Sequence, residues 1–221
     1  MEQASQNSSP VHGLSNGARM ILDVAKQLFA EQSFDAVSIS QIAKQAAVSK
    51  ANVFHHFVSK DELYLAVLRA ACEDTVGNLV EAHNSGNAGQ DLWAFFSSHL
   101  TAMLENRASV RLILREVMES KDGREQTLAE QVFAEYFSRL VRMVSEGQSQ
   151  ELLRKDFDPA LLAYLMFGAN VFFFENHNDT AHLAEGGFAR SPDRYSRDVF
   201  RLLLQGTLVD PESDFEFKTE T

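Results

Sequence analysis

The side chains best suited to specific recognition lie close together between Ser49 and Lys60. Asparagine can bond two edge atoms of adenine at once, and lysine can reach guanine or a phosphate. Asn52 and Lys50 supply these groups, and His55 follows them at a spacing that fits the outer face of one short helix. Lys60 comes at the start of the next helix, where a phosphate contact is easy. This set of groups is suited to the major groove of DNA.

Two short helices separated by a tight break are expected to position these side chains. Ser38 with Gln41 forms a capping box that predicts the start of the first helix, and Ser49 provides an N-cap for the second. Ser59 with Glu62 predicts the start of a third helix in the same way. The apolar residues that we expect to anchor the pair are Ile39, Ile42, Ala43, Val48, Val53, Phe54 and Phe57. Helix, turn and helix is the arrangement that lays its second helix in the major groove. A small helical hairpin with solvated polar residues is the alternative.

The predicted contacts with DNA fall into three groups. The groups expected to hold phosphates are Ser38, Ser49 and Lys60. The residues expected to face base edges are Lys50, Ala51, Asn52 and His55. Phe54 and His56 could either pack under the helix or touch the DNA backbone.

The segment from Gly17 to Cys72 resembles the N-terminal DNA-binding domain of the TetR family of transcriptional regulators. Its matching motifs are Phe-Ala-Glu-x-x-Phe at 29–34, Ile-Ala-x-x-Ala-x-Val-Ser at 42–49, and aromatic-His-x-Phe followed by Ser-Lys-x-x-Leu at 54–63. A glycine is common in the family where Gln32-Ser33 turns, and another where Ala51 stands. The resemblance implies dimers that pair through their last two long helices, and a small molecule that releases the DNA.

The whole chain is expected to be all-α, with a helix-turn-helix domain joined by a long helix to a helical-bundle domain for ligand binding and dimerisation. The predicted domains are a disordered tail at 1–16, the DNA-binding domain at 17–75, the bundle at 76–210 and a tail at 211–221. Helices are predicted over 17–32, 59–83, 90–105, 108–119, 125–150, 159–174 and 191–207, with breaks near 84–89 and 121–123.

The charge of the chain is divided unevenly. The formal net charge is −11 overall, yet residues 17–60 hold five basic and three acidic side chains, a net charge of +2. The acidic remainder would repel phosphate, so the asymmetry directs the N-terminal domain towards DNA. The single cysteine, the absence of a visible signal peptide and the absence of an apolar run of ~20 residues predict a cytoplasmic protein that does not cross a membrane.

The segment Leu161–Phe174 is apolar almost all the way round, which predicts a helix buried on more than one side. We expect one face to pack on its own domain and another on a second subunit, together with the helix at 191–207. The predicted interface residues are Leu161, Leu165, Gly168, Phe172, Val199 and Leu203. A fully buried helix in a monomer is the alternative.

An effector site is expected inside the bundle, on the strength of the family resemblance. The residues that could line it are Trp93, Phe96, His99, Met103, Leu112, Arg115, Phe133, Phe137 and Phe172. The effector would be apolar or aromatic, with Arg111, Arg115 or His99 as its polar anchor. An ordinary packed core is the alternative for each of these residues. Binding would shift the population towards a form in which the two recognition helices are wrongly spaced, and the helix at 59–83 would act as the lever.

The pattern Glu-x-His-x-Asp-x-x-His at 175–182 contains metal-ligand residue types in what reads as a loop. A solvated loop is the preferred interpretation, and we predict no metal, no cofactor and no enzyme activity. A helical adaptor or metal-binding protein that has lost DNA binding is the alternative function. The sequence is compatible with activation as well as repression.

Overall fold

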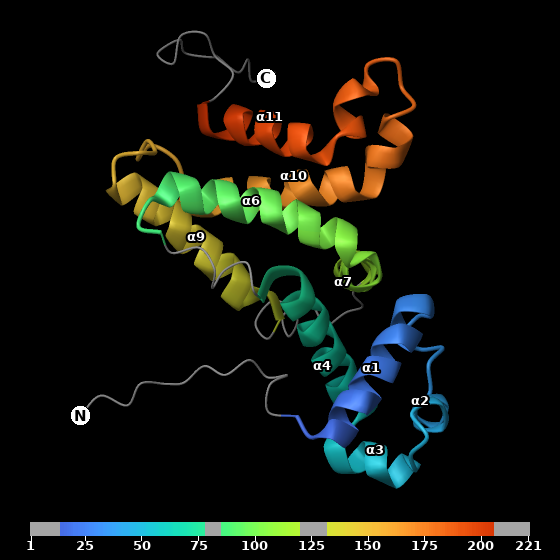
Figure 1. Ribbon diagram of the computed structural model, residues 1–221. Helices are drawn as coiled ribbons and strands as arrows, with labels where there is room; N and C mark the ends of the chain where they lie inside the picture. Colours follow the sequence, from blue (N-terminus) through green and yellow to red (C-terminus); the bar gives the residue numbers. More distant parts are fainter. Residues whose placement is uncertain (1–13, 78–84, 120–131, 206–221) are drawn as a thin grey trace, which may run out of the picture. The chain divides into compact units, whose positions relative to one another are not determined.

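The computed structural model describes residues 14–77, 85–119 and 132–205, and every regular element in these ranges is helical (Figure 1). The predicted all-α class is therefore confirmed. The elements are α1 (Asn16–Glu31), α2 (Ile39–Gln45), α3 (Lys50–His56), α4 (Lys60–Cys72), the π-helix η1 (Glu73–Gly77), α6 (Ala88–Glu105), α7 (Arg107–Glu119), α9 (Ala134–Ser149), α10 (Pro159–Thr180), the 3₁₀-helix η3 (Gly186–Arg190) and α11 (Pro192–Gln205).

The chain forms two compact units. Unit 1 contains residues 1–83 and 101–139, and unit 2 contains residues 84–100 and 140–221. The predicted tails and the predicted break at 121–123 lie wholly or almost wholly outside the described residues, and the domain boundary at residue 75 stays a prediction. None of the described helices has the length and apolar character needed to span a membrane.

Serine hydroxyls cap the first four helices of unit 1. Ser15, Ser38, Ser49 and Ser59 each accept a hydrogen bond at 3.0–3.2 Å from the backbone N–H three residues later. Each cap satisfies one of the amide groups that a helix start leaves without an intrahelical partner. Three of these helix starts, at Ser38, Ser49 and Ser59, are the ones the sequence predicts.

Helices α1 and α4 pack on each other and share a core, and α2 and α3 pack on α1 (Figure 1). The fully buried side chains of this core include Ile21 and Phe29 from α1 and Leu63 and Val67 from α4. Val53 and Phe57 anchor α3 in this core as predicted, with exposed fractions of 0% and 4%. Phe54 was expected to help and does not, because its side chain is 49% exposed. It lies one helical position from Val53, which turns it away from the core.

The break between α2 and α3 is a Schellman motif. The N–H of Val48 donates to the carbonyl of Ala43 at 2.9 Å, and the N–H of Ala47 donates to the carbonyl of Lys44 at 3.3 Å. Ala47 has a φ of 52°, the left-handed conformation that this motif requires after a helix. Glycine is the usual residue in this conformation, which is why residue preferences alone do not place the turn at Ala47. Val48, expected to be buried here, is half-buried.

The helix predicted over 59–83 changes type before it ends. Regular α-helical geometry stops at Cys72, and Glu73–Gly77 forms a π-helical turn. The Thr75 hydroxyl donates to the carbonyls of Ala71 and Cys72, both at 3.1 Å. A hydroxyl that bonds back into the preceding turn competes with the regular ladder, which is consistent with the change of geometry. Residues 78–83 lie outside the described part of the chain, as do residues 125–131 of the helix predicted over 125–150.

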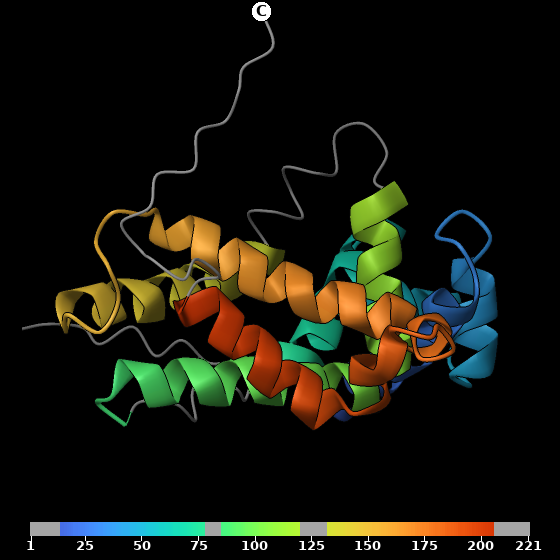
Figure 2. The same ribbon diagram turned by 90° about the horizontal axis from the view of Figure 1, so that it is seen from above.

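Unit 2 is built mainly from α6, α10 and α11. Helices α10 and α11 run side by side, in orange and red in Figure 2, and both contact the aromatic side chains of α6. Asp158 caps α10 through the N–H of Ala160 at 2.8 Å, with Pro159 in the first turn, so α10 begins where the helix at 159–174 is predicted. Ser191 accepts from the N–H of Arg194 at 3.3 Å at the start of α11. Helix α10 continues to Thr180, six residues beyond the predicted end.

Candidate nucleic-acid interface

Helix α3 presents the polar face that the sequence predicts for base contacts. Lys50, Ala51, Asn52 and His55 are all exposed, whereas Val53 on the other side of the helix is fully buried. Fixing the inner side of a short helix in a core also fixes the directions in which its outer side chains leave it. This face therefore combines an amide, an ammonium group and an imidazole on a rigid support, which is the chemistry that reads base edges.

The two serines predicted to contact phosphates lie at the starts of α2 and α3. The oxygens of Ser38 and Ser49 accept backbone N–H groups at 3.2 and 3.1 Å, and both residues are exposed. A hydroxyl that accepts through its oxygen can still donate its own hydrogen to a phosphate. The helix starts add partial positive charge at the same two places.

The remaining predicted contacts differ in their surroundings. Phe54 is exposed beside the residues predicted to face base edges, so its side chain is not packed under the helix. His56 is half-buried, and a methyl group added at Gly17 would lie 3.3 Å from its Nε2, so His56 borders the start of α1. The Lys60 ammonium lies 4.2 Å from the centre of the Phe34 ring, a neighbour that the sequence did not predict. An aromatic residue before the first short helix is the signal that could have suggested it.

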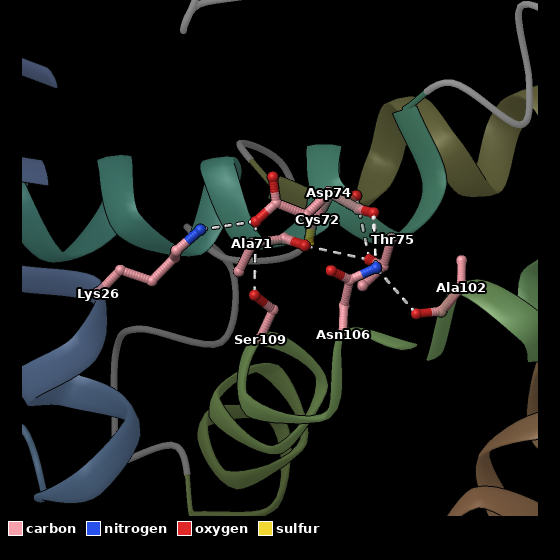
Figure 3. Close-up of polar contacts among 8 residues, drawn as sticks. All are labelled: Lys26, Ala71, Cys72, Asp74, Thr75, Ala102, Asn106 and Ser109. Carbon is pink, nitrogen blue, oxygen red and sulfur yellow. Dashed lines mark hydrogen bonds and ion pairs between the residues drawn. The ribbon is translucent and has the colours of Figure 1, made fainter. Parts of the chain in front are cut away.

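A polar network joins three elements of unit 1 around Asp74 (Figure 3). The Lys26 ammonium on α1 is 2.7 Å from Oδ2 of Asp74, and the Ser109 hydroxyl on α7 donates to the same oxygen at 3.4 Å. Asn106 donates from its side-chain amide to the carbonyls of Asp74 and Ala102, at 3.3 and 3.0 Å. The π-helical turn is thus tied both to α1 and to α7.

The residues predicted to line an effector site are divided between the two units. Trp93, Phe96, His99 and Phe172 belong to unit 2, and Met103, Leu112, Arg115, Phe133 and Phe137 belong to unit 1. Phe96, His99, Met103 and Leu112 are buried. Phe172 is 70% exposed, so it does not line the interior of unit 2 and remains a predicted interface residue. Among the three predicted anchors, Arg115 donates to the carbonyl of Phe29, and Arg111 is exposed.

His99 is one of the buried polar residues of unit 2, together with Asp91, Asn170 and Ser196. Its Nδ1 is 3.2 Å from the side-chain amide of Asn170, which also donates to the carbonyl of Phe96 at 2.9 Å. The Phe95 ring stacks on the imidazole and the Phe167 ring meets it edge-on. Burial lowers the pKa of His99 to about 4, so the imidazole is neutral at physiological pH.

The predicted interface residues of α10 form one exposed stripe. Leu161, Leu165, Gly168 and Phe172 are all exposed, and Tyr164 joins them at 68% exposure. Positions 161, 164, 165, 168 and 172 follow the spacing of a single helix face. A methyl group added at Gly168 would meet no atom within 4 Å. Val199 and Leu203 of α11 are half-buried, and the neighbouring Leu202 is 53% exposed.

The acidic and histidine residues at 175–182 do not form the loop expected from the sequence. Glu175, His177 and Asp179 lie within α10, and only His182 follows its end. Nδ1 of His177 contacts the carbonyls of Phe173 and Phe174 at 3.0 and 3.1 Å, within its own helix. Within residues 14–77, 85–119 and 132–205, no group of three or more His, Cys, Asp or Glu side chains is placed to hold a metal ion.

Two family models match this chain. Residues 21–67 match the model described as bacterial regulatory proteins, tetR family, and residues 90–200 match the tetracyclin repressor-like C-terminal domain. The chain is 25% identical over 150 residues to the HTH-type transcriptional repressor KstR2 of Rhodococcus jostii, which covers 67% of this chain and 74% of that protein.

Solved structures of similar fold include two regulators with bound ligands. FadR from Bacillus subtilis in complex with stearoyl-CoA has a TM-score of 0.70 at 19% identity, covering 86% of this chain and 99% of that one. AibR in complex with isovaleryl coenzyme A and operator DNA has a TM-score of 0.61 at 19% identity, covering 86% and 98%. At these identities the likeness establishes the fold.

Proposed function

We propose that this chain, which belongs to the TetR family and is a DNA-binding transcriptional regulator, is a homodimeric repressor of a palindromic operator. A small apolar or aromatic effector releases it from the DNA. The observation that supports this most is the outer face of α3, where Lys50, Asn52 and His55 stand exposed on a helix anchored by Val53 and Phe57. Selection of bound fragments from random DNA should yield one motif with two inverted half-sites. A set of bound fragments with no common sequence would contradict the proposal.

Dimerisation is supported by the exposed stripe of α10. A row of exposed leucine, tyrosine and phenylalanine side chains is costly in water and is typical of a surface that another protein covers. The open surrounding of Gly168 would let a partner helix come close. Two recognition helices related by a two-fold axis would read half-sites about 34–36 Å apart, or a multiple of that distance. Because a two-fold axis requires two identical subunits, a second copy of this chain is the partner that would cover the stripe.

The dimer proposal can be tested with one charge placed in the stripe. Phe172→Glu puts a carboxylate where the partner's apolar side chains would pack, and we expect monomers in analytical ultracentrifugation together with loss of operator binding. Leu183→Glu is the matched control, because Leu183 is 59% exposed but lies outside the stripe. Dimers that persist in Phe172→Glu at micromolar concentration would contradict this interface.

An apolar effector is supported by the aromatic surroundings of His99 and by the ligands of two structural relatives. FadR and AibR were solved with CoA thioesters, so stearoyl-CoA and isovaleryl-CoA are the first probes to use. We expect an effector to raise the melting temperature and to weaken operator binding by a coupling energy of about 1–3 kcal/mol. A thermal-shift screen of apolar and aromatic compounds in which none stabilises the protein would count against an effector.

The Asp74 network is the proposed route by which α4 passes the change to the DNA-reading helices. It ties η1 to α1 and to α7 (Figure 3). Asp74→Ala should therefore alter operator affinity without changing which sequence is preferred. Thr75→Val is the control, because it removes the hydroxyl bonds to Ala71 and Cys72 at the neighbouring position and keeps Asp74. It shows how much of the change in operator affinity comes from a general loss of the π-turn.

A further inference from the structure

The Lys60 side chain is held over an aromatic ring at the start of α4. Its ammonium lies 4.2 Å from the centre of Phe34, within the range of a cation–π contact. A cation in the first turn is disfavoured by the helix dipole, and Asp61 and Glu62 supply the negative charge that this end prefers. Lys60 is thus poorly placed to stabilise α4 itself, and the ring provides the attraction that keeps its ammonium in position.

The Phe34 ring is itself fixed by the core of unit 1. It stacks on Phe29 with centroids 6.1 Å apart and is tilted on Tyr64 at 4.9 Å. Phe29 and Tyr64 are 0% and 2% exposed, and their own rings meet edge-on at 4.8 Å. The Tyr64 hydroxyl donates to Oε2 of Glu116 on α7 at 2.7 Å, which locks the second ring. The surface on which the ammonium rests therefore has little freedom to move.

We propose that Phe34 is a positioning residue for DNA binding: it touches no DNA itself and holds the Lys60 ammonium ready for a phosphate. This inference rests on the proposed phosphate contact of Lys60. A long lysine side chain loses much of its rotamer freedom when it binds, and a side chain that is already ordered loses less. The ring also accepts the ammonium without neutralising it, so the charge remains available to the phosphate.

A double-mutant cycle on operator affinity tests the proposal. The four proteins are the wild type, Phe34→Leu, Lys60→Met and the double variant, and the probe is the DNA fragment that the wild type selects from a random pool. We expect Phe34→Leu to weaken binding about fivefold for each bound protomer, the size expected for a cation–π contact. In the Lys60→Met background the same change should have no effect, because the group it positions is gone.

The salt dependence of binding tests the phosphate contact of Lys60 separately from the positioning role of Phe34. Lys60→Met should reduce the slope of log affinity against log salt by about 0.9 for each phosphate that the protein no longer neutralises. An unchanged slope would show that Lys60 binds no phosphate, which refutes the premise and the inference together. A reduced slope combined with equal effects of Phe34→Leu in both backgrounds would leave the phosphate contact intact and overturn the role of Phe34.

Two further outcomes complete the test. Phe34→Tyr keeps the ring and should bind operator as well as the wild type, even if Phe34→Leu lowers the melting temperature. If Phe34→Tyr loses as much affinity as Phe34→Leu, the ring is not what matters and the proposal is wrong. If Phe34→Leu binds operator more tightly than the wild type, the ring competes with the phosphate for Lys60, and the proposal is again wrong.

Discussion

The buried hydrogen bond between Tyr64 and Glu116 gives the sharpest stability prediction. The Tyr64 hydroxyl donates to Oε2 of Glu116 at 2.7 Å, and the two residues are 2% and 7% exposed. Tyr64→Phe removes one oxygen and leaves the ring contacts with Phe29 and Phe34 in place. The substitution therefore takes away a donor to a buried carboxyl group and keeps the ring.

The expected loss follows from the type of bond. A hydrogen bond to a charged group contributes about 1.5–3 kcal/mol, and burial prevents water from replacing the lost donor fully. We expect Tyr64→Phe to lower the free energy of unfolding by about 2 kcal/mol. For a chain of this size, that loss corresponds to a fall in melting temperature of about 4–8 °C.

Urea and thermal unfolding followed by circular dichroism provide the measurement. The matched control is Tyr136→Phe, because Tyr136 also donates to a glutamate, Glu73, at 2.9 Å, but from a half-buried position. Water can replace that donor more easily, so the control should lose less than about 1 kcal/mol. A Tyr64→Phe protein as stable as the wild type, or no less stable than the control, would show that the buried bond to Glu116 does not contribute the expected stability.

Three further predictions concern other parts of the chain. Burial lowers the pKa of His99 to about 4, so below pH 6.5 the unfolded chain takes up a proton that the folded protein does not. The free energy of unfolding should therefore fall by up to about 3 kcal/mol between pH 6.5 and pH 4. Urea unfolding at the two pH values should show that His99→Gln lacks this part of the pH dependence. Burial raises the pKa of the Cys72 thiol to about 12, so mass spectrometry should find no iodoacetamide adduct in the native protein and full labelling in urea. A methyl group at Gly186 would lie 1.7 Å from the Thr180 carbonyl oxygen, so Gly186→Ala should destabilise the protein by about 1–3 kcal/mol in thermal unfolding. A methyl group at Gly187 would meet no atom within 4 Å, so Gly187→Ala should leave the stability unchanged.

Each of these predictions has a clear contrary result. An unchanged pH dependence in His99→Gln would mean that the imidazole is not held neutral in the fold. Rapid native labelling of Cys72 would mean that α4 opens around it. Equal melting temperatures for the two glycine variants would mean that η3 moves freely away from the end of α10.

The helix-turn-helix could be predicted from the sequence because local signals dominate there. The serines at positions 38, 49 and 59 each begin a helix where predicted, since a cap needs only its own side chain and the next turn of backbone. The inward turn of Val53 and Phe57 likewise follows from helical spacing. The expectation that Phe54 helps to anchor the helix was wrong because apolar character alone does not say which side of a seven-residue helix is inside, and its contact with DNA stays a prediction.

Two of the features that the sequence did not predict involve partners far along the chain. The π-helical turn at Glu73–Gly77 involves contacts of Asp74 with Lys26 and Ser109, which are distant in sequence. The position of Lys60 over Phe34 depends on how α1 and α4 meet. The end of α10 was placed too early because the polar residues from Glu175 onward resemble a loop, although His177 and Asp179 stand on the same helix.

Sequencing of the DNA bound by the protein across a genome, for the wild type and for Asn52→Ala, tests the role of α3 most directly. Asn178→Ala is the matched control, since it removes another exposed asparagine from α10 in unit 2. We predict one palindromic motif for the wild type and the control, and loss of that motif in Asn52→Ala. If Asn52→Ala occupied the same sites as the wild type, the assignment of α3 as the recognition helix through Asn52 would be contradicted.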